Sequence, residues 1–284
     1  MTYAALPDLV LEPLVRNALT EDMGSFGDIT TRAVIPAGVT YQAKLNARDD
    51  GVVSGMQIAR IAFQLVDPSL KIDTLVGDGS AVTKGQTLMT IEGAASSILM
   101  GERVALNFAG RLSGIASLTA QFVAQTAGTK TRITCTRKTT PGLRTVEKLA
   151  VLHGGGFNHR IGVFDAYLIK ENHIIACGGI TQAIQKAKEL NPGKPVEVET
   201  ESLEEVKLAI DAGADIIMLD NFDIEATCKA VELTDGKAKL ESSGNITDAT
   251  LVSVAETGID FISIGALTKH VQAIDLSMRL VMGD

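Results

Sequence analysis

The sequence contains no tryptophan, and phenylalanine and tyrosine supply the whole aromatic share of only 4% in 284 residues. Proteins that bind single-stranded nucleic acid stack bases on aromatic side chains, so this scarcity argues against such a role. Positive charge is also in deficit, with 26 lysines and arginines against 34 aspartates and glutamates. The resulting net charge of −8 argues further against nucleic acid and against anionic membranes as partners.

Cysteine is scarce as well: Cys135, Cys177 and Cys228 are odd in number, lie far apart and form no C-x-x-C pair. This excludes a zinc knuckle and a disulfide framework, and reduced thiols are expected. The N-terminus lacks a basic region followed by an apolar run, which is the pattern of a signal peptide. No apolar stretch is long enough to span a bilayer. We therefore expect a cytoplasmic protein with no membrane partner.

Positive charge gathers in one stretch of this acidic chain. From Lys130 to His173 there are eight lysines and arginines, three acidic residues and three of the four histidines. A solvated basic face is one interpretation. However, Lys170 closes an apolar run, and Arg137 lies between a strand-like segment and a Pro-Gly turn. The cluster therefore favours a concave site for a polyanionic small molecule.

The C-terminal part of the chain alternates short apolar runs with helical segments. The last residues of successive runs are 21 to 34 positions apart, a spacing typical of βα units. Apolar runs without alternation suit parallel strands that are covered on both faces. We predict an α/β fold with an incomplete parallel barrel, because six runs are found and a full barrel has eight. The runs span residues 132–136, 166–170, 195–199, 215–220, 238–243 and 260–264.

The N-terminal part mixes both periodicities and predicts a smaller α+β sandwich domain. We place this domain at residues 1–113 and the barrel at 114–274. A C-terminal helix over 275–284 is expected to pack on the first domain. Other helices are expected over 6–21, 58–65 and 96–120, and strands over 41–48, 52–54, 70–75 and 88–91.

Polar side chains close several of the predicted barrel strands. Lys170, Glu199, Asp220 and Ser243 each end a run, and in a parallel barrel those ends share one rim, where sites are built. Any one of these residues alone could end a strand without a functional role, but four of them together indicate a site. The glycine-containing loops after the last two runs suit phosphate, because their backbone N–H groups can approach an anion.

The rim residues divide by charge into two groups with different chemistry. Arginine's planar fork binds a carboxylate in two places, so the cations favour a dicarboxylate ligand. Glu199 and Asp220 would repel such a ligand, which leaves them a divalent cation or ribose hydroxyls. Hard carboxylate oxygens suit Mg²⁺, which also neutralises pyrophosphate. The cations of the rim are Arg137, Lys138, His159, Arg160 and Lys170.

Seven short motifs, in order and with matching spacing, make the chain resemble the quinolinate phosphoribosyltransferase family over nearly its whole length. They are Glu102-Arg103-x-x-Leu106-Asn107, Thr136-Arg137-Lys138-Thr139-x-Pro141-Gly142-Leu143-Arg144, His159-Arg160, Lys170-Glu171-Asn172-His173, Glu197-Val198-Glu199, Met218-Leu219-Asp220-Asn221 and Ser243-Gly244-Asn245-Ile246. Cys135 stands where the family often has aspartate.

The resemblance implies a Mg²⁺-dependent transfer of phosphoribosyl from 5-phosphoribosyl 1-pyrophosphate to quinolinate, with loss of CO₂, in NAD biosynthesis. It implies Lys138, Lys170, Glu199 and Asp220 as catalytic residues, the last two also as metal ligands. A homodimer with shared active sites is implied, and a higher oligomer stays open. Implied substrate-binding residues are Arg103, Thr136, Arg137, Lys138, His159, Arg160, Lys170, Glu199, Asp220, Ser243, Gly244, Asn245, Ile264, Gly265 and Ala266.

Two other functions stay open from the residues alone. Lys170 at a strand end could form a Schiff base, as in an aldolase-like lyase on the same barrel. Alternatively, the chain could bind a phosphorylated metabolite without catalysis. Arg103, on the helix before the barrel, is a plain surface residue unless the resemblance holds.

Overall fold

The computed structural model describes residues 6–244 and 246–281, which form two compact units. The first unit comprises residues 6–120, 140–155 and 270–281, and the second comprises residues 121–139, 156–244 and 246–269. In the described part of the chain no helix has the length and apolarity needed to cross a membrane. Cys135, Cys177 and Cys228 form no disulfide bond with one another.

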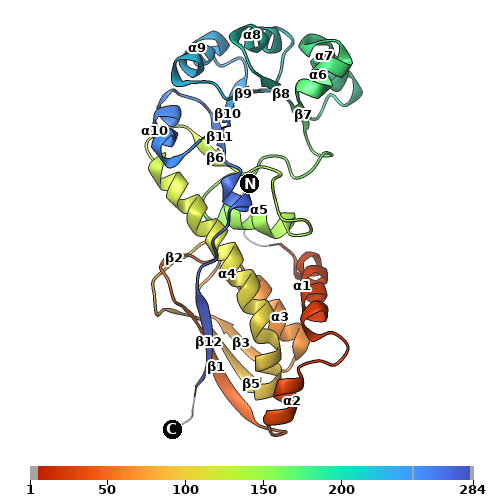
Figure 1. The fold of residues 1–284 in the computed structure, drawn as a ribbon, viewed down its shortest axis with the longest axis vertical. Coiled ribbons are helices and arrows are strands. Elements are labelled where there is room, and N and C mark those ends of the chain that lie inside the picture. The colour runs from red at the N-terminus through yellow and green to blue at the C-terminus, as the bar shows by residue number, and fades with distance from the viewer. Residues whose placement is uncertain (1–5, 245, 282–284) are drawn as a thin grey trace. The chain divides into compact units, whose positions relative to one another are not determined.

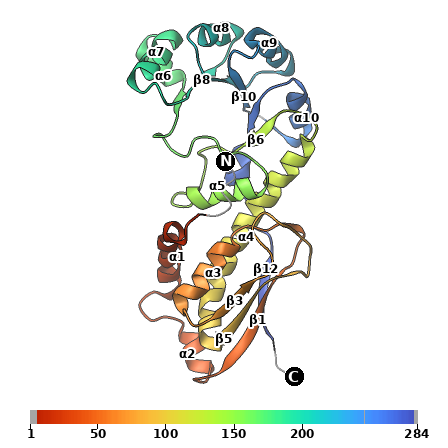
Figure 2. The same ribbon diagram turned by 180° about the vertical axis from the view of Figure 1, so that it is seen from behind.

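An antiparallel sheet organises the first unit. Its strand order is β12-β1-β5-β3, and every second residue of β1 is buried, namely Ala43, Leu45 and Ala47. Helices α3 and α4 cover this unit's core, where a Cβ on Gly101 of α4 would lie 2.6 Å from the ring of Phe63 of α3 (Figures 1 and 2). The elements are α1 (Asp8–Met23), α2 (Ile29–Val34), β1 (Thr40–Ala47), β2 (Gly51–Val52), α3 (Met56–Val66), β3 (Lys71–Thr74), β4 (Ala81–Val82), β5 (Thr87–Ala94), α4 (Ala95–Gln125), α5 (Arg144–His153) and β12 (Leu276–Val281).

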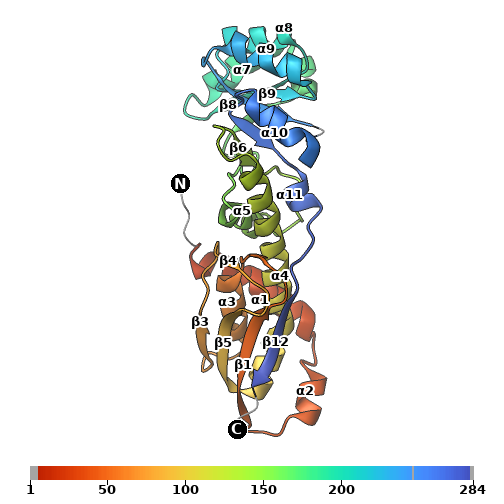
Figure 3. The same ribbon diagram turned by 90° about the vertical axis from the view of Figure 1, so that its left-hand side faces the viewer.

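The predicted helix over 275–284 is wrong, because residues 276–281 form strand β12. This strand pairs antiparallel with β1, from Gln42 opposite Val281 to Ala47 opposite Leu276 (Figure 3). Leu276, Met278 and Leu280 alternate with polar residues, a period of two that suits a strand. The partner strand comes from the other end of the chain, and local sequence does not reveal it. Residues 282–284 lie outside the described part.

The long helix α4 carries glycines where another segment of its unit passes close by. A Cβ on Gly114 would lie 2.1 Å from the carbonyl oxygen of Gln272, and one on Gly110 would lie 2.9 Å from that of Ile274. Larger residues at either position would push the chain before β12 away from the helix. The predicted long helix over 96–120 is confirmed and extends slightly further at both ends.

Six parallel strands in the order β6-β11-β10-β9-β8-β7 form the second unit. Figure 1 shows β7 to β10 in an arc, with α7, α8 and α9 on its outer side. Strands β6 and β7 are the two edges of this sheet, so the predicted incomplete parallel barrel is confirmed. The elements are β6 (Arg132–Thr134), β7 (Tyr167–Ile169), α6 (Glu171–Cys177), α7 (Ile180–Leu190), β8 (Val196–Thr200), α8 (Leu203–Asp211), β9 (Ile216–Asp220), α9 (Ile224–Thr234), β10 (Lys239–Ser243), α10 (Asp248–Glu256), β11 (Phe261–Ser263) and α11 (Ala266–Lys269).

Burial and capping explain why these strands and helices alternate. Val198, Ile217 and Leu219 are fully buried, as expected for strands covered on both faces. The helix after β8 begins where Ser202 accepts a hydrogen bond from the Glu205 N–H, and the helix after β9 begins in the same way at Asp223. Because the six strands are parallel, their carboxyl ends meet at one edge of the sheet, and this edge carries the candidate site.

Candidate active site

A cavity of about 350 Å³ opens at the carboxyl ends of the barrel strands. Seven of the predicted substrate-binding residues line it, and all belong to the second unit. Its lining also includes Leu168, Met218, Glu241 and Ser263, to which the sequence assigned no role. The seven predicted residues are Thr136, Arg137, Lys138, His159, Arg160, Lys170 and Ser243.

Three cations of this cavity have no anionic partner among the described residues. No carboxylate oxygen lies within 4.0 Å of a side-chain nitrogen of Arg137, Lys138 or Arg160 there. Arg160 Nη1 donates to the Ala166 carbonyl at 3.3 Å, while its buried Nε has no partner. Burial lowers the pKa of the Arg160 guanidinium and the charge of Arg137 lowers it further, whereas the more distant charges of Glu197 and Asp165 oppose this shift. The cavity therefore presents positive charge that a bound anion would satisfy.

A second group of charges lies at the ends of β7, β8 and β9. Lys170 directly follows β7, and its Nζ lies 2.7 Å from Oε2 of Glu199. Asp220 ends the neighbouring strand β9, where burial and then the charge of Glu199 raise its pKa. Asn221 Nδ2 donates to Asp220 at 2.8 Å. The structure thus brings the predicted carboxylate pair to adjacent strand ends, although neither carboxylate lines the cavity itself.

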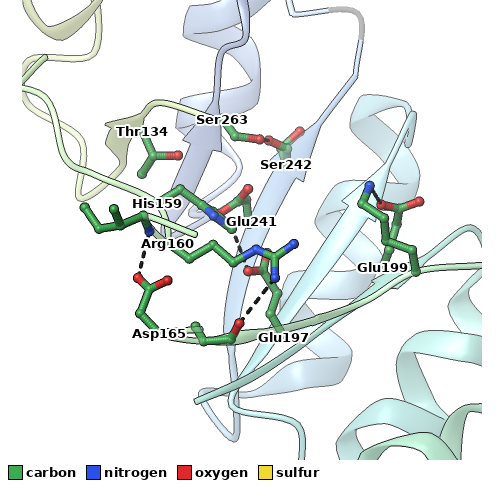
Figure 4. Close-up of polar contacts among 12 residues, drawn as sticks. Thr134, His159, Arg160, Asp165, Glu197, Glu199, Glu241, Ser242 and Ser263 are labelled. Carbon is green, nitrogen blue, oxygen red and sulfur yellow. Dashed lines mark hydrogen bonds and ion pairs between the residues drawn. The ribbon is translucent and has the colours of Figure 1, made fainter. Parts of the chain in front are cut away.

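A buried cluster of His159, Glu197 and Glu241 was not predicted as a unit. Figure 4 shows His159 directed at both glutamates, with Nε2 at 2.7 Å from Glu197 Oε2 and 3.8 Å from Glu241 Oε2. Burial raises the pKa of Glu241 to about 8, and the charge of Glu197 adds to this effect. Among the described residues, these three form the group with metal-ligand spacing, whereas Glu199 and Asp220 belong to no such group.

The two glycine-containing loops, which the sequence predicts to bind phosphate, are closely packed at their glycines. Gly244 has a φ of +89°, and a Cβ there would lie 2.2 Å from Oδ1 of Asn221. A Cβ on Gly265 would lie 3.1 Å from Cδ of Lys138. Ile264 is buried and donates its N–H to Thr134, and Ala266 begins α11. Asn245 lies outside the described residues.

Local hydrogen bonds explain three further motif positions. Thr136 Oγ1 accepts from the Lys138 N–H at 3.0 Å, which fixes the turn that presents Lys138. His173 Nδ1 accepts from the Lys170 N–H at 3.0 Å and thereby fixes the start of α6. Cys135, at the position often held by aspartate in the family, donates its S–H to Asn158 Oδ1 at 3.2 Å. Cysteine at this position thus makes a polar contact without carrying the charge of an aspartate.

Arg103 belongs to the first unit, where it is exposed on α4. It is not among the residues that line the cavity of the second unit. Its predicted role as a substrate ligand stays a prediction.

Comparison with known proteins gives a consistent family. The model of the quinolinate phosphoribosyl transferase N-terminal domain matches residues 28–113, and that of the C-terminal domain matches residues 115–279. A probable nicotinate-nucleotide pyrophosphorylase [carboxylating] from Synechocystis is 43% identical, covering 97% of this chain and 94% of the relative. The mitochondrial quinolinate phosphoribosyltransferase [decarboxylating] 2b from Nicotiana tabacum is 41% identical, covering 97% and 84% of the two chains.

Solved structures agree with the family models. The nicotinate-nucleotide pyrophosphorylase from Francisella tularensis superposes with a TM-score of 0.94 at 44% identity, covering 98% of both chains. The models of both domains, the similar sequences and the superposed structure thus indicate one family. The chain belongs to the quinolinate phosphoribosyltransferase family.

Proposed function

We propose that the protein transfers the phosphoribosyl group of 5-phosphoribosyl 1-pyrophosphate to quinolinate and releases CO₂, giving nicotinate mononucleotide and pyrophosphate. The observation that carries the proposal is the set of cations in the cavity that lack an anionic partner, in a chain of this family. A ligand with two carboxylates supplies the missing negative charge. The two guanidinium forks, of Arg137 and Arg160, suit one carboxylate each.

The reaction needs no covalent intermediate with the protein. The pyridine nitrogen of quinolinate attacks C1 of the ribose, the bond to pyrophosphate breaks, and that oxygen takes the electron pair. Positive charge develops on the ribose as the bond breaks. Glu199 and Asp220 are the anions available at the same rim, and we assign them to stabilise this charge.

Decarboxylation follows from the product of the first step. The ring nitrogen is now a pyridinium, so the 2-carboxylate leaves as CO₂ and its electron pair stays on the adjacent ring carbon, which takes a proton. Arg137, His159 and Arg160 hold the ring carboxylates in place during this step, and the cavity limits access of water. We assign Lys138 and Lys170 to the charges of the two substrates, because both line the cavity.

Mg²⁺ belongs to the proposal as a cofactor. Glu199 and Asp220 offer hard oxygen ligands, and their mutual repulsion is what a divalent cation would relieve. The chemistry of the two carboxylates suits the ion, and they would hold it together with ligands from the substrate, because they form no complete group of three protein ligands among the described residues. When bound, Mg²⁺ supplies neutralisation of the pyrophosphate charge. Lys170 Nζ lies 2.7 Å from Glu199, so its ammonium would neighbour the ion and the phosphates.

Phosphate binding is assigned to the two close-packed loops at the same edge. Gly244 and Gly265 let the backbone approach an anion, and Ser243 adds a hydroxyl that lines the cavity. Asn245, Ile264 and Ala266 complete the predicted set. Replacing Gly244 by alanine should displace Asn221 and weaken binding of the ribosyl pyrophosphate.

A homodimer, with Arg103 of one subunit completing the site of the other, also belongs to the proposal. Arg103 is exposed and has no ion pair among the described residues, which leaves it free to meet a partner's substrate. Arg103→Ala and Glu199→Ala should each be inactive, and mixed dimers should recover about a quarter of the sites after random exchange. No recovery, with exchange confirmed by mass spectrometry, would place Arg103 in its own subunit's site or outside any site. A cytoplasmic location stays part of the proposal.

The test of the function is incubation with quinolinate, 5-phosphoribosyl 1-pyrophosphate and Mg²⁺, following nicotinate mononucleotide and CO₂ together. Both products should appear in equal amounts. Binding of the ribosyl pyrophosphate without CO₂ release would indicate a binding protein instead. Borohydride trapping of a carbonyl substrate on Lys170 would indicate the Schiff-base lyase, for which the Lys170 ion pair with Glu199 gives no support.

A further inference from the structure

The His159, Glu197 and Glu241 cluster forms the floor of the substrate cavity. Glu241 and His159 line the cavity at the carboxyl ends of the strands. Both also line a second cavity of about 170 Å³, together with Glu197 and with Tyr167 and Ile216 at the amino ends of β7 and β9. His159 and Glu241, which line both cavities, therefore lie between the two spaces, and Glu197 lines only the second.

Charge is not balanced within this floor. Two carboxylates share one imidazole, and among the described residues neither glutamate forms an ion pair with a lysine or arginine. The charge of Arg160 acts on Glu197 only from beyond 4.0 Å. The side chains of Glu197 and Glu241 are only 4% and 2% exposed, so bulk solvent screens the charge of neither. Two ionised glutamates here would leave at least one negative charge buried without a partner, which is costly.

Distance distinguishes the two carboxylates. His159 Nε2 lies 2.7 Å from Glu197 Oε2, within hydrogen-bond range, so these two side chains share one proton. Glu241 lies 3.8 Å from the same nitrogen, beyond hydrogen-bond range. One buried oxygen of Glu241, Oε1, has no partner among the described residues.

The groups that face Glu241 come from every element around it. Glu197 of β8 opposes its ionisation, whereas His159 of the preceding loop and Ser263 of β11 favour it. On β9 its register partner is the uncharged Met218. Burial is the largest influence, and the balance of all of them raises the pKa of Glu241 to about 8.

We propose that Glu241 is a neutral carboxylic acid in the working enzyme, and that this un-ionised state lets the cavity accept a dianionic ligand. The proposal rests on the proposed function, because quinolinate is the dianion concerned. Ionisation of Glu241 places a negative charge under the bound carboxylates and offsets the cations above them. Glu197 has the separate task of orienting His159 and is a positioning residue.

The test is the dissociation constant of quinolinate, measured by calorimetry from pH 6.5 to 9.5 on the full-length protein. In the wild-type chain, affinity should fall by up to about tenfold for each pH unit above about 8, as Glu241 ionises. Glu241→Gln keeps the shape and cannot ionise, so its ratio of dissociation constants between pH 9.5 and pH 7 should be close to one. Glu232→Gln, at an exposed position on α9, is the matched control and should keep the wild-type profile.

A ligand-free readout accompanies this measurement, in case Glu241→Gln folds poorly. Carbon NMR of the glutamate carboxyl groups in wild-type protein should show one group titrating near pH 8. All glutamates titrating below pH 6, or parallel pH profiles for wild type and Glu241→Gln, would overturn the inference and leave the proposed function intact. Zinc or manganese that copurifies with the wild type and is lost in Glu241→Gln would also overturn it, in favour of a metal site. If wild type bound no quinolinate at any pH, both proposals would fall together.

Discussion

Two pairs of carboxylates in the same barrel differ in depth, and strand β8 contributes one member to each. Glu197 and Glu199 are two residues apart, so both point to the same face of the strand. Glu197 is buried with Glu241 under the cavity, whereas Glu199 lies nearer the rim beside Asp220. One step of two residues along a strand thus separates two different environments.

Depth decides what each pair can do. The side chain of Glu199 is 14% exposed and forms an ion pair with the ammonium of Lys170, which it can exchange for another cation. Glu241 is 2% exposed with no such cation, so it is held neutral by burial. Glutamate thus serves as an anion at the rim, at Glu199, and as a neutral acid in the floor of the cavity, at Glu241.

The largest expected effect is loss of turnover from the rim pair. Glu199→Gln and Asp220→Asn should each lower kcat by about 100-fold or more, since the developing ribose charge loses its counter-charge. Quinolinate affinity should change little, because neither carboxylate lines the cavity. Steady-state kinetics and calorimetry measure the two quantities, and unchanged turnover with unchanged Mg²⁺ dependence in both variants would refute the assignment.

Substrate specificity gives the next effect. Nicotinate lacks the 2-carboxylate and leaves cations such as Arg160 unpaired, at a cost of a few kcal/mol. Its kcat/KM should therefore be about 100-fold lower than that of quinolinate. Comparable efficiency with the two acids would contradict a cavity built for two carboxylates.

A smaller effect is expected from the arginines above the floor. Arg160→Lys and Arg137→Lys keep the charge and remove the planar fork, so quinolinate should bind about tenfold more weakly in each. Lys207→Arg, at an exposed position on α8, controls for exchange of the two cations elsewhere in the unit. Wild-type affinity in both arginine variants would remove them from the site.

The smallest effect concerns stability. Folding raises the pKa of Glu241, so the contribution of this group to stability is fully present below its unfolded value, near 4.5, and is lost as pH rises through about 8. Glu241→Gln does not titrate, so its stability relative to wild type should rise between these limits and level off above them. The gain should reach about 1–3 kcal/mol at pH 9 by urea unfolding. A difference that does not vary with pH would contradict a buried neutral acid.

The sequence predicted the second unit well because its signals are local. Most of the parallel strands are buried apolar runs that a polar residue ends or directly follows, so Lys170, Glu199, Asp220 and Ser243 could be placed at one rim. Strand β12 could not be placed, because its partner β1 comes from the other end of the chain.

Glu241 was not predicted as a site residue, because it lies in the middle of strand β10 and the prediction used only residues at strand ends. It lies two residues before Ser243 and so points to the same face, but deeper. The residue type alone gives no sign that a glutamate is buried without a cation, because this depends on His159 and Glu197, which arrive from a distant loop and another strand. The alternating glutamates of Glu197-Val198-Glu199 were the one available signal.

The most direct test of the two-depth account is the pH profile of quinolinate affinity in a matched pair of variants, Glu199→Gln and Glu241→Gln. Each replaces one glutamate of the barrel by its neutral isostere. Glu199→Gln should keep the loss of quinolinate affinity above pH 8, whereas Glu241→Gln should abolish that loss. Abolition of that loss by Glu199→Gln, with Glu241→Gln retaining it, would contradict the account.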